Sequence, residues 1–434
     1  MSFELHVPEG WSQVKLSDLG EVNRGRSRHR PRDAAHLYGG PYPFVQTGDV
    51  KASKGRITQH SQTYSEDGLA QSRLWPKGTM CITIAANIAE TGILTYPACF
   101  PDSVIGFIAD ESKCNVYFIE YVFRLLRKRI QAQATGSVQD NINLQTLERL
   151  LFPIPALEEQ NRIAAVLGEL DDKIHLNYEI NQTLEEIAQA TFKSWFVDFE
   201  PVKAKMNGEQ PEGMDAATAS LFPEKLVESE LGLIPEGWEV GELTELAKLD
   251  TTSVKPNKEP ETIWEHYSIP AFDDGYYPSF DTGESIKSNK YKVKANAVLV
   301  SKLNPRFQRI WLPLPIDAEQ AICSTEFMQF VPNAPALKPY LYSLVKSTPF
   351  QNELMNTVTG TTGSRQRAQP KQVAKAQVVV PPSQLMELYS EKVGAMFSMT
   401  QQNIRQNIEL AKLRDTLLPK LLSGEIELET ATEN

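Results

Sequence analysis

Arginine side chains that could bind phosphate or a base edge are concentrated in one short stretch of the sequence. Every second residue from Arg24 to Arg32 is an arginine. A guanidinium is a planar fork of five N–H donors, which matches the oxygens of a phosphate or the O6 and N7 atoms of guanine. Gly25 would let the backbone approach a nucleic-acid strand closely. The alternative is a solvated basic loop. The residues that we expect to contact nucleic acid are Arg24, Arg26, Ser27, Arg28, His29 and Arg30.

Two other polar segments of the first half are weaker candidates. The side-chain amide of Gln46, beside Thr47, could pair with adenine through two hydrogen bonds, although a turn after a strand would have the same sequence. Around Ser137 and Gln139, the polar loop 136–141 offers groups of the kind that position a protein on a phosphate backbone.

The second half has two comparable loops. One follows an expected strand at 298–300 and combines cations with amides; the other, at 359–367, is basic and rich in glycine and threonine. The sequence does not separate base contacts from phosphate contacts. The candidate residues of these loops are Lys302, Asn304, Arg306, Gln308, Arg309, Ser364, Arg365 and Arg367.

Catalytic motifs are poorly matched. The segment 304–307 (Asn-Pro-Arg-Phe) differs from the Asn-Pro-Pro-aromatic motif of amino-methyltransferases at the second proline, and no glycine-rich cofactor loop accompanies it. Asp102 with Glu111 and Lys113 has the residue types of a metal-dependent nuclease, at short spacing. No Gly-x-x-x-x-Gly-Lys-Ser/Thr loop is present, so ATP-driven translocation would belong to a partner. The six histidines are scattered, so we expect no metal site. A nuclease remains an alternative, as does a helical scaffold that joins proteins without contacting DNA.

Composition narrows the class of protein. A chain of 434 residues with 41% hydrophobic and 23% charged residues is typical of two or three globular domains. The four cysteines are far apart, so a disulfide framework is not expected, and with no signal sequence or membrane span we expect a cytoplasmic protein. The net charge of −11 would by itself repel DNA. DNA binding depends on the local charge, however, and the arginines lie apart from the carboxylates in the sequence.

The sequence contains an internal repeat. Pro-Glu-Gly-Trp at 8–11 recurs at 235–238, an offset of 227 that also relates Gly136-Ser137 to Gly363-Ser364. The offset then becomes 226 and relates Asn177 to Asn403, and Asn181 to Asn407. We therefore expect two copies of one architecture.

Each copy divides into a globular part and a helical part. The globular parts, 1–155 and 233–382, mix short β-branched runs with turns and helical stretches, which predicts an α/β or α+β domain. The helical parts, 156–200 and 383–426, carry apolar residues at three-four spacing, and the segment 201–232 connects the copies.

The two helices are expected to pair. About forty residues at ~1.5 Å each give roughly 60 Å, too long for a compact core, so an antiparallel coiled coil is favoured. On the stripe of the second helix we place Met399 and Leu413 among the apolar residues. The polar residues Asn177 and Asn403 fall on the two stripes near mid-helix, and we expect them to lie close to each other and to a pseudo-two-fold axis, with exposed asparagines as the alternative.

The helices resemble a known family. Phe-Lys-Ser-Trp-Phe-Val-Asp-Phe at 192–199 and Leu-Arg-Asp-Thr-Leu-Leu-Pro-Lys-Leu-Leu-Ser-Gly-Glu-Ile at 413–426 are similar to conserved signatures of type I restriction-modification specificity (S) subunits. The resemblance implies two target recognition domains that read the halves of a bipartite, asymmetric DNA site, with the helices as a spacer. It implies a non-catalytic subunit that binds double-stranded DNA, two adenine-methyltransferase subunits and restriction subunits. S-adenosylmethionine, ATP and Mg are then expected on the partners, and no cofactor on this chain.

Overall fold

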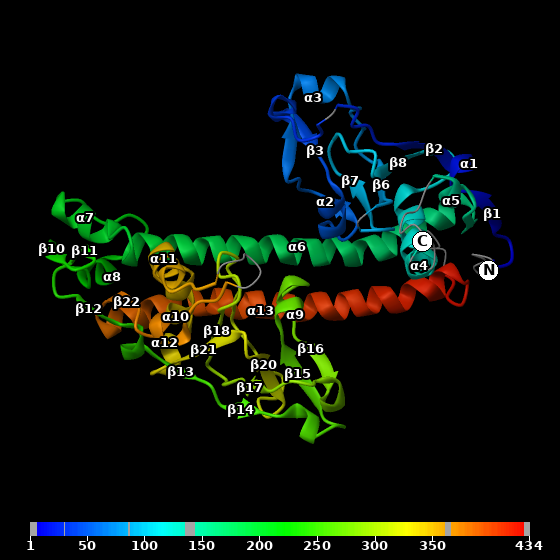
Figure 1. Ribbon diagram of the computed structural model, residues 1–434. Helices are drawn as coiled ribbons and strands as arrows, with labels where there is room; N and C mark the ends of the chain where they lie inside the picture. The colour runs from blue at the N-terminus through cyan, green and yellow to red at the C-terminus, as the bar shows by residue number, and fades with distance from the viewer. Residues whose placement is uncertain (1–6, 30, 86, 135–143, 361–365, 429–434) are drawn as a thin grey trace, which may run out of the picture. The chain divides into compact units, whose positions relative to one another are not determined.

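The computed structural model describes residues 7–29, 31–85, 87–134, 144–360 and 366–428 (Figure 1). The chain divides into two units, each of which is described by itself. Unit 1 comprises Met1–Ile174 and Ile408–Asn434, and unit 2 comprises His175–Asn407. The helices α6 (Leu157–Phe196) and α13 (Ser383–Leu422) each contribute to both units.

Unit 1 is built on a five-stranded sheet in the order β2-β8-β6-β7-β4, with the pairs β3-β5 and β1-β9 beside it. Its central strand β6 is buried along its whole length. The strands are β1 Ser12–Lys15, β2 Gly20–Arg24, β3 Tyr38–Phe44, β4 Arg56–Ile57, β5 Gln62–Tyr64, β6 Met80–Thr83, β7 Thr91–Leu94, β8 Val104–Ala109 and β9 Leu151–Ile154. The shorter helices are α1 Leu16–Leu19, η1 Ala35–Leu37, α2 Thr47–Ala52, α3 Glu66–Ala70, α4 Val116–Ala134 and α5 Leu144–Glu148.

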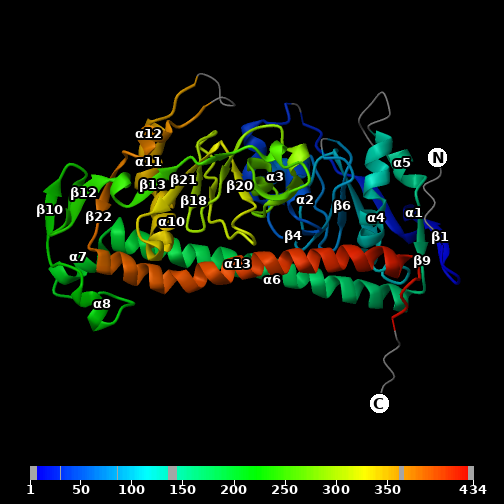
Figure 2. The same cartoon turned by 90° about the horizontal axis from the view of Figure 1, so that it is seen from below.

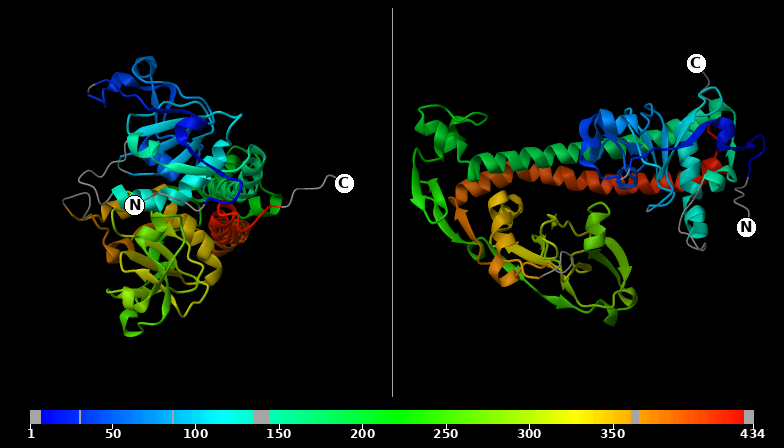
Figure 3. Two further views of the ribbon diagram at one scale, coloured as in Figure 1. Left: turned by 90° about the vertical axis from the view of Figure 1, so that its right-hand side faces the viewer. Right: turned by 45° about the horizontal axis from the view of Figure 1, so that its top comes forward.

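Unit 2 contains a four-stranded sheet, β13-β21-β18-β19, and a five-stranded sheet, β14-β17-β20-β15-β16. Figure 3 shows α10 against the long helices and the five-stranded sheet farther from them. The strands are β10 Leu226–Ser229, β11 Gly232–Pro235, β12 Glu239–Glu242, β13 Ala247–Asp250, β14 Ser253–Val254, β15 Ile263–Tyr267, β16 Ser279–Thr282, β17 Lys290–Lys292, β18 Val298–Ser301, β19 Ile310–Trp311, β20 Ala321–Ser324, β21 Phe327–Pro332 and β22 Gln377–Val380. The shorter helices are α7 Glu200–Met206, α8 Ala216–Ser220, η2 Leu243–Glu245, η3 Pro256–Lys258, α9 Ile269–Asp273, η4 Gly283–Ser285, η5 Pro335–Leu337, α10 Lys338–Lys346, α11 Thr348–Asn356 and α12 Pro370–Val373.

The strand order confirms the internal repeat. In unit 1 the strands β2-β8-β6-β7 are adjacent and antiparallel, and in unit 2 the strands β13-β21-β18-β19 follow the same order with the same antiparallel pairing. The pair β1-β9 likewise corresponds to β12-β22. Both long helices have 40 residues and begin 226 positions apart, at Leu157 and Ser383.

The repeated Pro-Glu-Gly-Trp segment is a turn with a required glycine. Gly10 and Gly237 both have φ near +81°, a region that side chains with a Cβ avoid. The amide of Trp11 donates to the Pro8 carbonyl at 3.2 Å, and the amide of Trp238 donates to the Pro235 carbonyl at 3.0 Å. The tetrapeptide is therefore repeated because each copy enters its first strand through the same turn.

Within each unit, the segments of α6 and α13 lie side by side and run in opposite directions (Figures 1 and 2). In unit 2, Asn177 bonds to Asn407 and the Tyr389 hydroxyl donates to the Ala188 carbonyl; in unit 1, Arg414 bonds to Asp171. The predicted antiparallel pairing is confirmed.

One part of the predicted apolar stripe is wrong. Met399 is 45% exposed and Leu413 is 47% exposed, whereas Asn403, Asn407 and Leu418 are buried. The residues that face α6 alternate between spacings of three and four, because paired helices repeat every 3.5 residues. After Met396 the spacing is four, where the prediction had three. Met399 and Leu413 therefore point away from α6.

Four asparagines occupy the seam of unit 2. The Asn177 amide donates to Asn407 Oδ1 at 2.8 Å, and the Asn403 amide donates to Asn181 Oδ1 at 2.9 Å. Because Asn177 corresponds to Asn403 and Asn181 to Asn407, these bonds are two copies of one contact around a local two-fold axis. Asn177 and Asn403 are buried in the seam as predicted, but each pairs with the asparagine one turn from the other.

We expect these pairs to show measurable coupling. Asn177→Leu removes the donor to the buried Asn407 Oδ1 and to Oε1 of the exposed Gln406, and the loss at Asn407 costs about 1–3 kcal/mol. Asn177→Leu with Asn407→Leu should cost less than the sum of the single substitutions. Urea unfolding of the four proteins in the cycle measures the coupling, and strict additivity would show that the pair does not fix the register.

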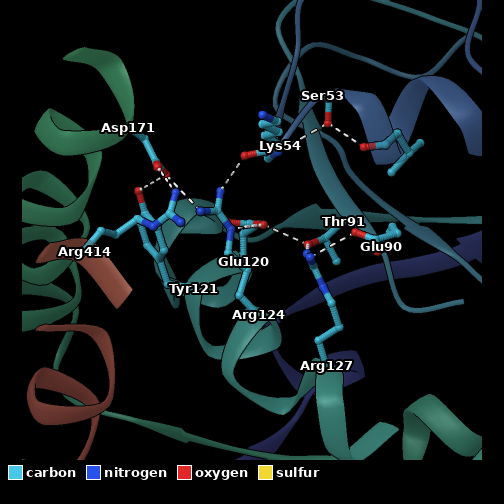
Figure 4. A network of polar contacts seen from close by, with 12 residues as sticks. Ser53, Lys54, Glu90, Thr91, Glu120, Tyr121, Arg124, Arg127, Asp171 and Arg414 are labelled. Carbon is cyan, nitrogen blue, oxygen red and sulfur yellow. Dashed lines mark hydrogen bonds and ion pairs between the residues drawn. The ribbon is translucent and has the colours of Figure 1, made fainter. Parts of the chain in front are cut away.

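In unit 1, charged side chains join the globular part to the helices (Figure 4). Asp171 of α6 accepts from the Tyr121 hydroxyl at 2.7 Å, from Arg124 at 3.1 Å and from Arg414 of α13 at 2.6 Å. Arg124 also bonds to Glu120 at 2.7 Å, and Glu120 accepts from Thr91 of β7 at 2.8 Å. This network therefore fixes α4 and the sheet to both long helices.

Unit 2 makes the corresponding joint from aromatic side chains. Phe192, Tyr340 and Tyr389 pack with ring centroids 5.5–6.3 Å apart. The Tyr389 hydroxyl donates to the Ala188 carbonyl at 2.9 Å and accepts from the Ser343 hydroxyl at 2.8 Å, so its polar atom is satisfied. An ion pair between Lys346 of α10 and Glu185 of α6, at 2.7 Å, adds to these aromatic contacts, so the joints of the two copies differ in their proportion of charged and aromatic groups.

Candidate nucleic-acid interface

The arginine stretch of unit 1 continues the edge strand β2. Arg24 lies opposite Ile105 of β8, and the next two amides still pair, Gly25 with the Val104 carbonyl and Arg26 with the Phe100 carbonyl. In an extended chain alternate side chains share a face. Arg24, Arg26 and Arg28 are accordingly all exposed, and none of them has an ion-pair partner among the residues that the structure describes.

The residues between these arginines face inward. Ser27 is 7% exposed and lies against Tyr64, so its side chain leaves the set of candidate contacts. A Cβ on Gly25 would lie 2.3 Å from the Pro101 carbonyl oxygen. Packing inside the domain therefore requires a glycine at position 25. We had expected Gly25 to let a DNA strand approach, and the packing explains this glycine instead.

Two residues of the stretch have partners inside the domain. His29 Nδ1–H donates to the Pro31 carbonyl at 3.1 Å, and the His29 ring packs edge-on against His36. Arg32 forms an ion pair with Asp102 at 2.7 Å. Asp102 is thereby engaged by a cation of the fold, and it is one of the carboxylates considered for a nuclease.

The segment 71–74 lies beside the arginine stretch and was not indicated by the sequence. The Ser72 hydroxyl donates to the Arg26 carbonyl at 2.9 Å, and Gln71 accepts from the His29 amide at 3.0 Å. Arg73 stacks on Trp75 and pairs with Glu21. No local motif marks this segment, because its position depends on contacts with residues more than 40 positions away.

Gln46 and Thr47 form the start of α2. Gln46 is the N-cap residue, its amide N–H donates to Asp49 at 2.8 Å, and its side chain donates to Gln62 at 2.6 Å. The start of α2 explains the polar residues at this position without a contact to DNA, as the alternative of a turn after a strand would. Base contact by Gln46 or Thr47 stays a prediction.

Several candidates lie outside the described residues. They are Arg30, Ser137, Gln139, Ser364 and Arg365.

In unit 2 the two predicted loops lie next to each other. The Asn304 amide donates to the Gln366 carbonyl at 2.9 Å, and the Ala368 amide donates to the Lys302 carbonyl at 2.9 Å. Asn304 has a φ of +46° and its side-chain oxygen is buried, so it shapes the loop. Lys302 is partly exposed, and Arg306 and Gln308 are exposed at the tip.

Two cations of these loops are held by carboxylates. Arg309 binds both oxygens of Asp273, at 2.7 and 2.9 Å, and Arg367 binds both oxygens of Glu326, at 3.1 Å. The Glu326 carboxylate raises the pKa of Arg367 above its usual value. Such paired guanidiniums have fewer donors left for DNA, so Arg306 and Gln308 are the stronger candidates.

The candidates of the two units lie at the same edge of corresponding sheets. In unit 1, the arginine stretch leaves β2 at the level where β6 ends, since Thr83 pairs with Val104 and Arg24 with Ile105. In unit 2, the loop 302–309 leaves β18, the counterpart of β6. Each copy therefore presents cations at one equivalent edge, from different segments.

Sequence comparison finds similar proteins along the whole chain. A family model described as type I restriction modification DNA specificity domain matches residues 8–186. The HindI specificity subunit of Haemophilus influenzae is 27% identical over 96% of this chain and 100% of its own length. Along nearly its whole length the chain is therefore similar to type I specificity subunits. The MjaIX specificity subunit of Methanocaldococcus jannaschii, 26% identical over 98% of this chain and 95% of its own, is a second full-length relative.

A solved structure shares the fold of this chain. The crystal structure of a type I restriction-modification S subunit from M. genitalium covers 99% of this chain and is itself covered completely, with a TM-score of 0.54 and 15% identity. Among the residues described, no helix is long and apolar enough to cross a membrane.

Proposed function

We propose that this chain is the DNA-specificity subunit of a type I restriction-modification complex, and that each unit reads one half of a bipartite, asymmetric site. The target recognition domains are 1–155 and 233–382. The helices 156–200 and 383–426 are the spacer between them, and 201–232 connects the copies.

One observation supports this proposal most strongly. The same end of the sheet carries exposed cations in both copies, yet on different segments. In unit 1 they are Arg24, the last residue of β2, with Arg26 and Arg28 after it; in unit 2 the cation is Arg306, after β18. Two domains that recognise unrelated DNA sequences need the same fold with different residues at the DNA-binding surface. Fixed cations position the phosphate backbone, and side chains between them read base edges.

Catalysis is assigned to partners. We propose that two methyltransferase subunits bind S-adenosylmethionine, that restriction subunits use ATP and Mg, and that this chain directs both to the site in the cytoplasm of a bacterium or archaeon. The chain's own contribution is to hold the site in register. The acidic remainder of its surface limits unspecific DNA binding, because phosphate repels it.

Binding in the presence of the methyltransferase subunit tests the proposal. We expect the complex to bind one bipartite duplex roughly 10³-fold or more tightly than unrelated duplexes, with an affinity that falls as salt rises. A scaffold that does not read DNA would show no preference. Equal affinity for every duplex would refute the specificity role.

A further inference from the structure

An aromatic side chain is exposed at the tip of the loop 302–309. Phe307 is 50% exposed, in a position where burial inside the domain would be the ordinary outcome. It lies between two candidate DNA contacts, Arg306 and Gln308, so its ring is presented on the same surface as they are.

The loop holds this ring in place. The Phe307 amide donates to the Asn304 carbonyl at 3.0 Å, and the Arg309 amide donates to the Phe307 carbonyl at 2.8 Å. Asn304, in its left-handed conformation, is tied to Gln366 of the neighbouring loop. An exposed side chain on such a fixed backbone is already ordered for binding, which lowers the entropic cost of a contact.

Two guanidiniums lie over the ring. The Cζ atoms of Arg306 and Arg309 are 4.7 and 5.3 Å from its centroid, and Arg309 is itself fixed by Asp273. Since cations cover the ring, its edge is what it offers to a ligand. The ring edge is apolar and has cations beside it. In a DNA groove the ring edge could contact a methyl group while the cations face the phosphates on either side.

We infer that Phe307 is a specificity-determining residue that contacts the C5 methyl group of a thymine in the major groove of the second half-site. The thymine methyl is the apolar group that a base pair presents in that groove. This inference rests on the proposed function and adds to it one base that is read by contact with carbon rather than by a hydrogen bond.

Replacement of single thymines tests it. The full chain, in complex with its methyltransferase subunits, is bound to duplexes in which each thymine of the site is replaced in turn by deoxyuridine, which lacks the methyl. At one position of the second half-site, uracil should weaken the wild type about four-fold, the value of one buried methyl. Phe307→Ala should bind the unsubstituted site more weakly by a similar factor and be insensitive to uracil at that position. Phe307→Leu should restore part of the sensitivity.

The scan also separates the possible failures. The first half-site is the internal control, and its uracil profile should be the same for wild type and Phe307→Ala. Identical profiles in the second half-site, a second half-site without thymine, or unstacking of bases reported by 2-aminopurine next to the contact would overturn the role of Phe307 while the specificity function stands. A wild-type complex without sequence preference would overturn both.

Discussion

Arg26→Ala and Arg28→Ala are each expected to weaken recognition of the first half-site about 5- to 150-fold, the value of one bidentate base contact at about 1–3 kcal/mol. The expectation follows from the alternation in this stretch, which directs both guanidiniums outward and leaves them without carboxylate partners among the residues described. Binding of the complex to duplexes with one half-site altered at a time measures the effect.

The same measurements distinguish the two kinds of contact. Removal of an arginine that contacts a base should reduce discrimination at one base pair. Removal of an arginine that contacts a phosphate should weaken binding to all sequences alike and lower the salt slope by about one. Arg32→Ala is the matched control, because Asp102 already occupies that guanidinium at 2.7 Å, and its effect should be smaller. Arg306→Ala should act on the second half-site alone. Equal loss at both halves for Arg26→Ala would contradict two independent readers.

Asp171→Ala is expected to destabilise unit 1 by about 3–5 kcal/mol, as removal of one partner from a buried ion network does. The Asp171 side chain is 9% exposed and faces the guanidiniums of Arg124 and Arg414, which would remain buried without their shared carboxylate. Urea unfolding measures the loss. Hydrogen exchange should rise in α4 and stay unchanged in α10, whose contacts with the long helices do not involve Asp171.

Its neighbour provides the control. Asp172 pairs with Arg56, but its side chain is 69% exposed, so Asp172→Ala should change the free energy of unfolding by about 1 kcal/mol or less. Similar losses for the two substitutions would show that the network does not join α4 to the helices.

The network also predicts a pH dependence. Burial acts to raise the pKa of Asp171, but Arg124, Arg414 and the hydrogen bonds from Arg414 and Tyr121 outweigh it, and the pKa is lowered below the ordinary 3.8. A carboxyl whose pKa is lower in the folded state contributes stability that is present above its unfolded pKa and is lost as the pH falls through the folded value. The stability difference between wild type and Asp171→Asn should therefore be constant near neutral pH and shrink below pH 3.8.

The features that repeat along the chain were predictable from the sequence. The shared offset implied two copies, and the equivalent strand orders and the 40-residue helices agree with it. Helix starts followed from local rules: α6 begins one residue after the predicted boundary at 156 and α13 begins at 383 as predicted. Local periodicity suffices for such elements because it depends on neighbouring residues.

Long-range partners were not predictable. Arg309 and Arg367 look like free cations in the sequence, yet Asp273 and Glu326, 36 and 41 residues away, bind them. Ser27 faces Tyr64 inside the domain, whereas its neighbours Arg26 and Arg28 face outward. Which side chains face inward depends on how β2 pairs in the sheet, and the sequence alone does not show that pairing. The exact partner of Asn177 likewise depended on the stagger of two helices, and a shift of one turn separates Asn403 from Asn407.

Mapping of methylated adenines in cells that carry this chain with its methyltransferase subunit tests the central claim most directly. We expect methylation at one bipartite motif, with two unrelated halves separated by a gap of fixed length that is not read. In cells with Arg26→Ala or Arg28→Ala, the requirement should relax in one half of the motif only. A continuous motif, a gap of variable length, or methylation without sequence preference would contradict two readers held at a fixed distance.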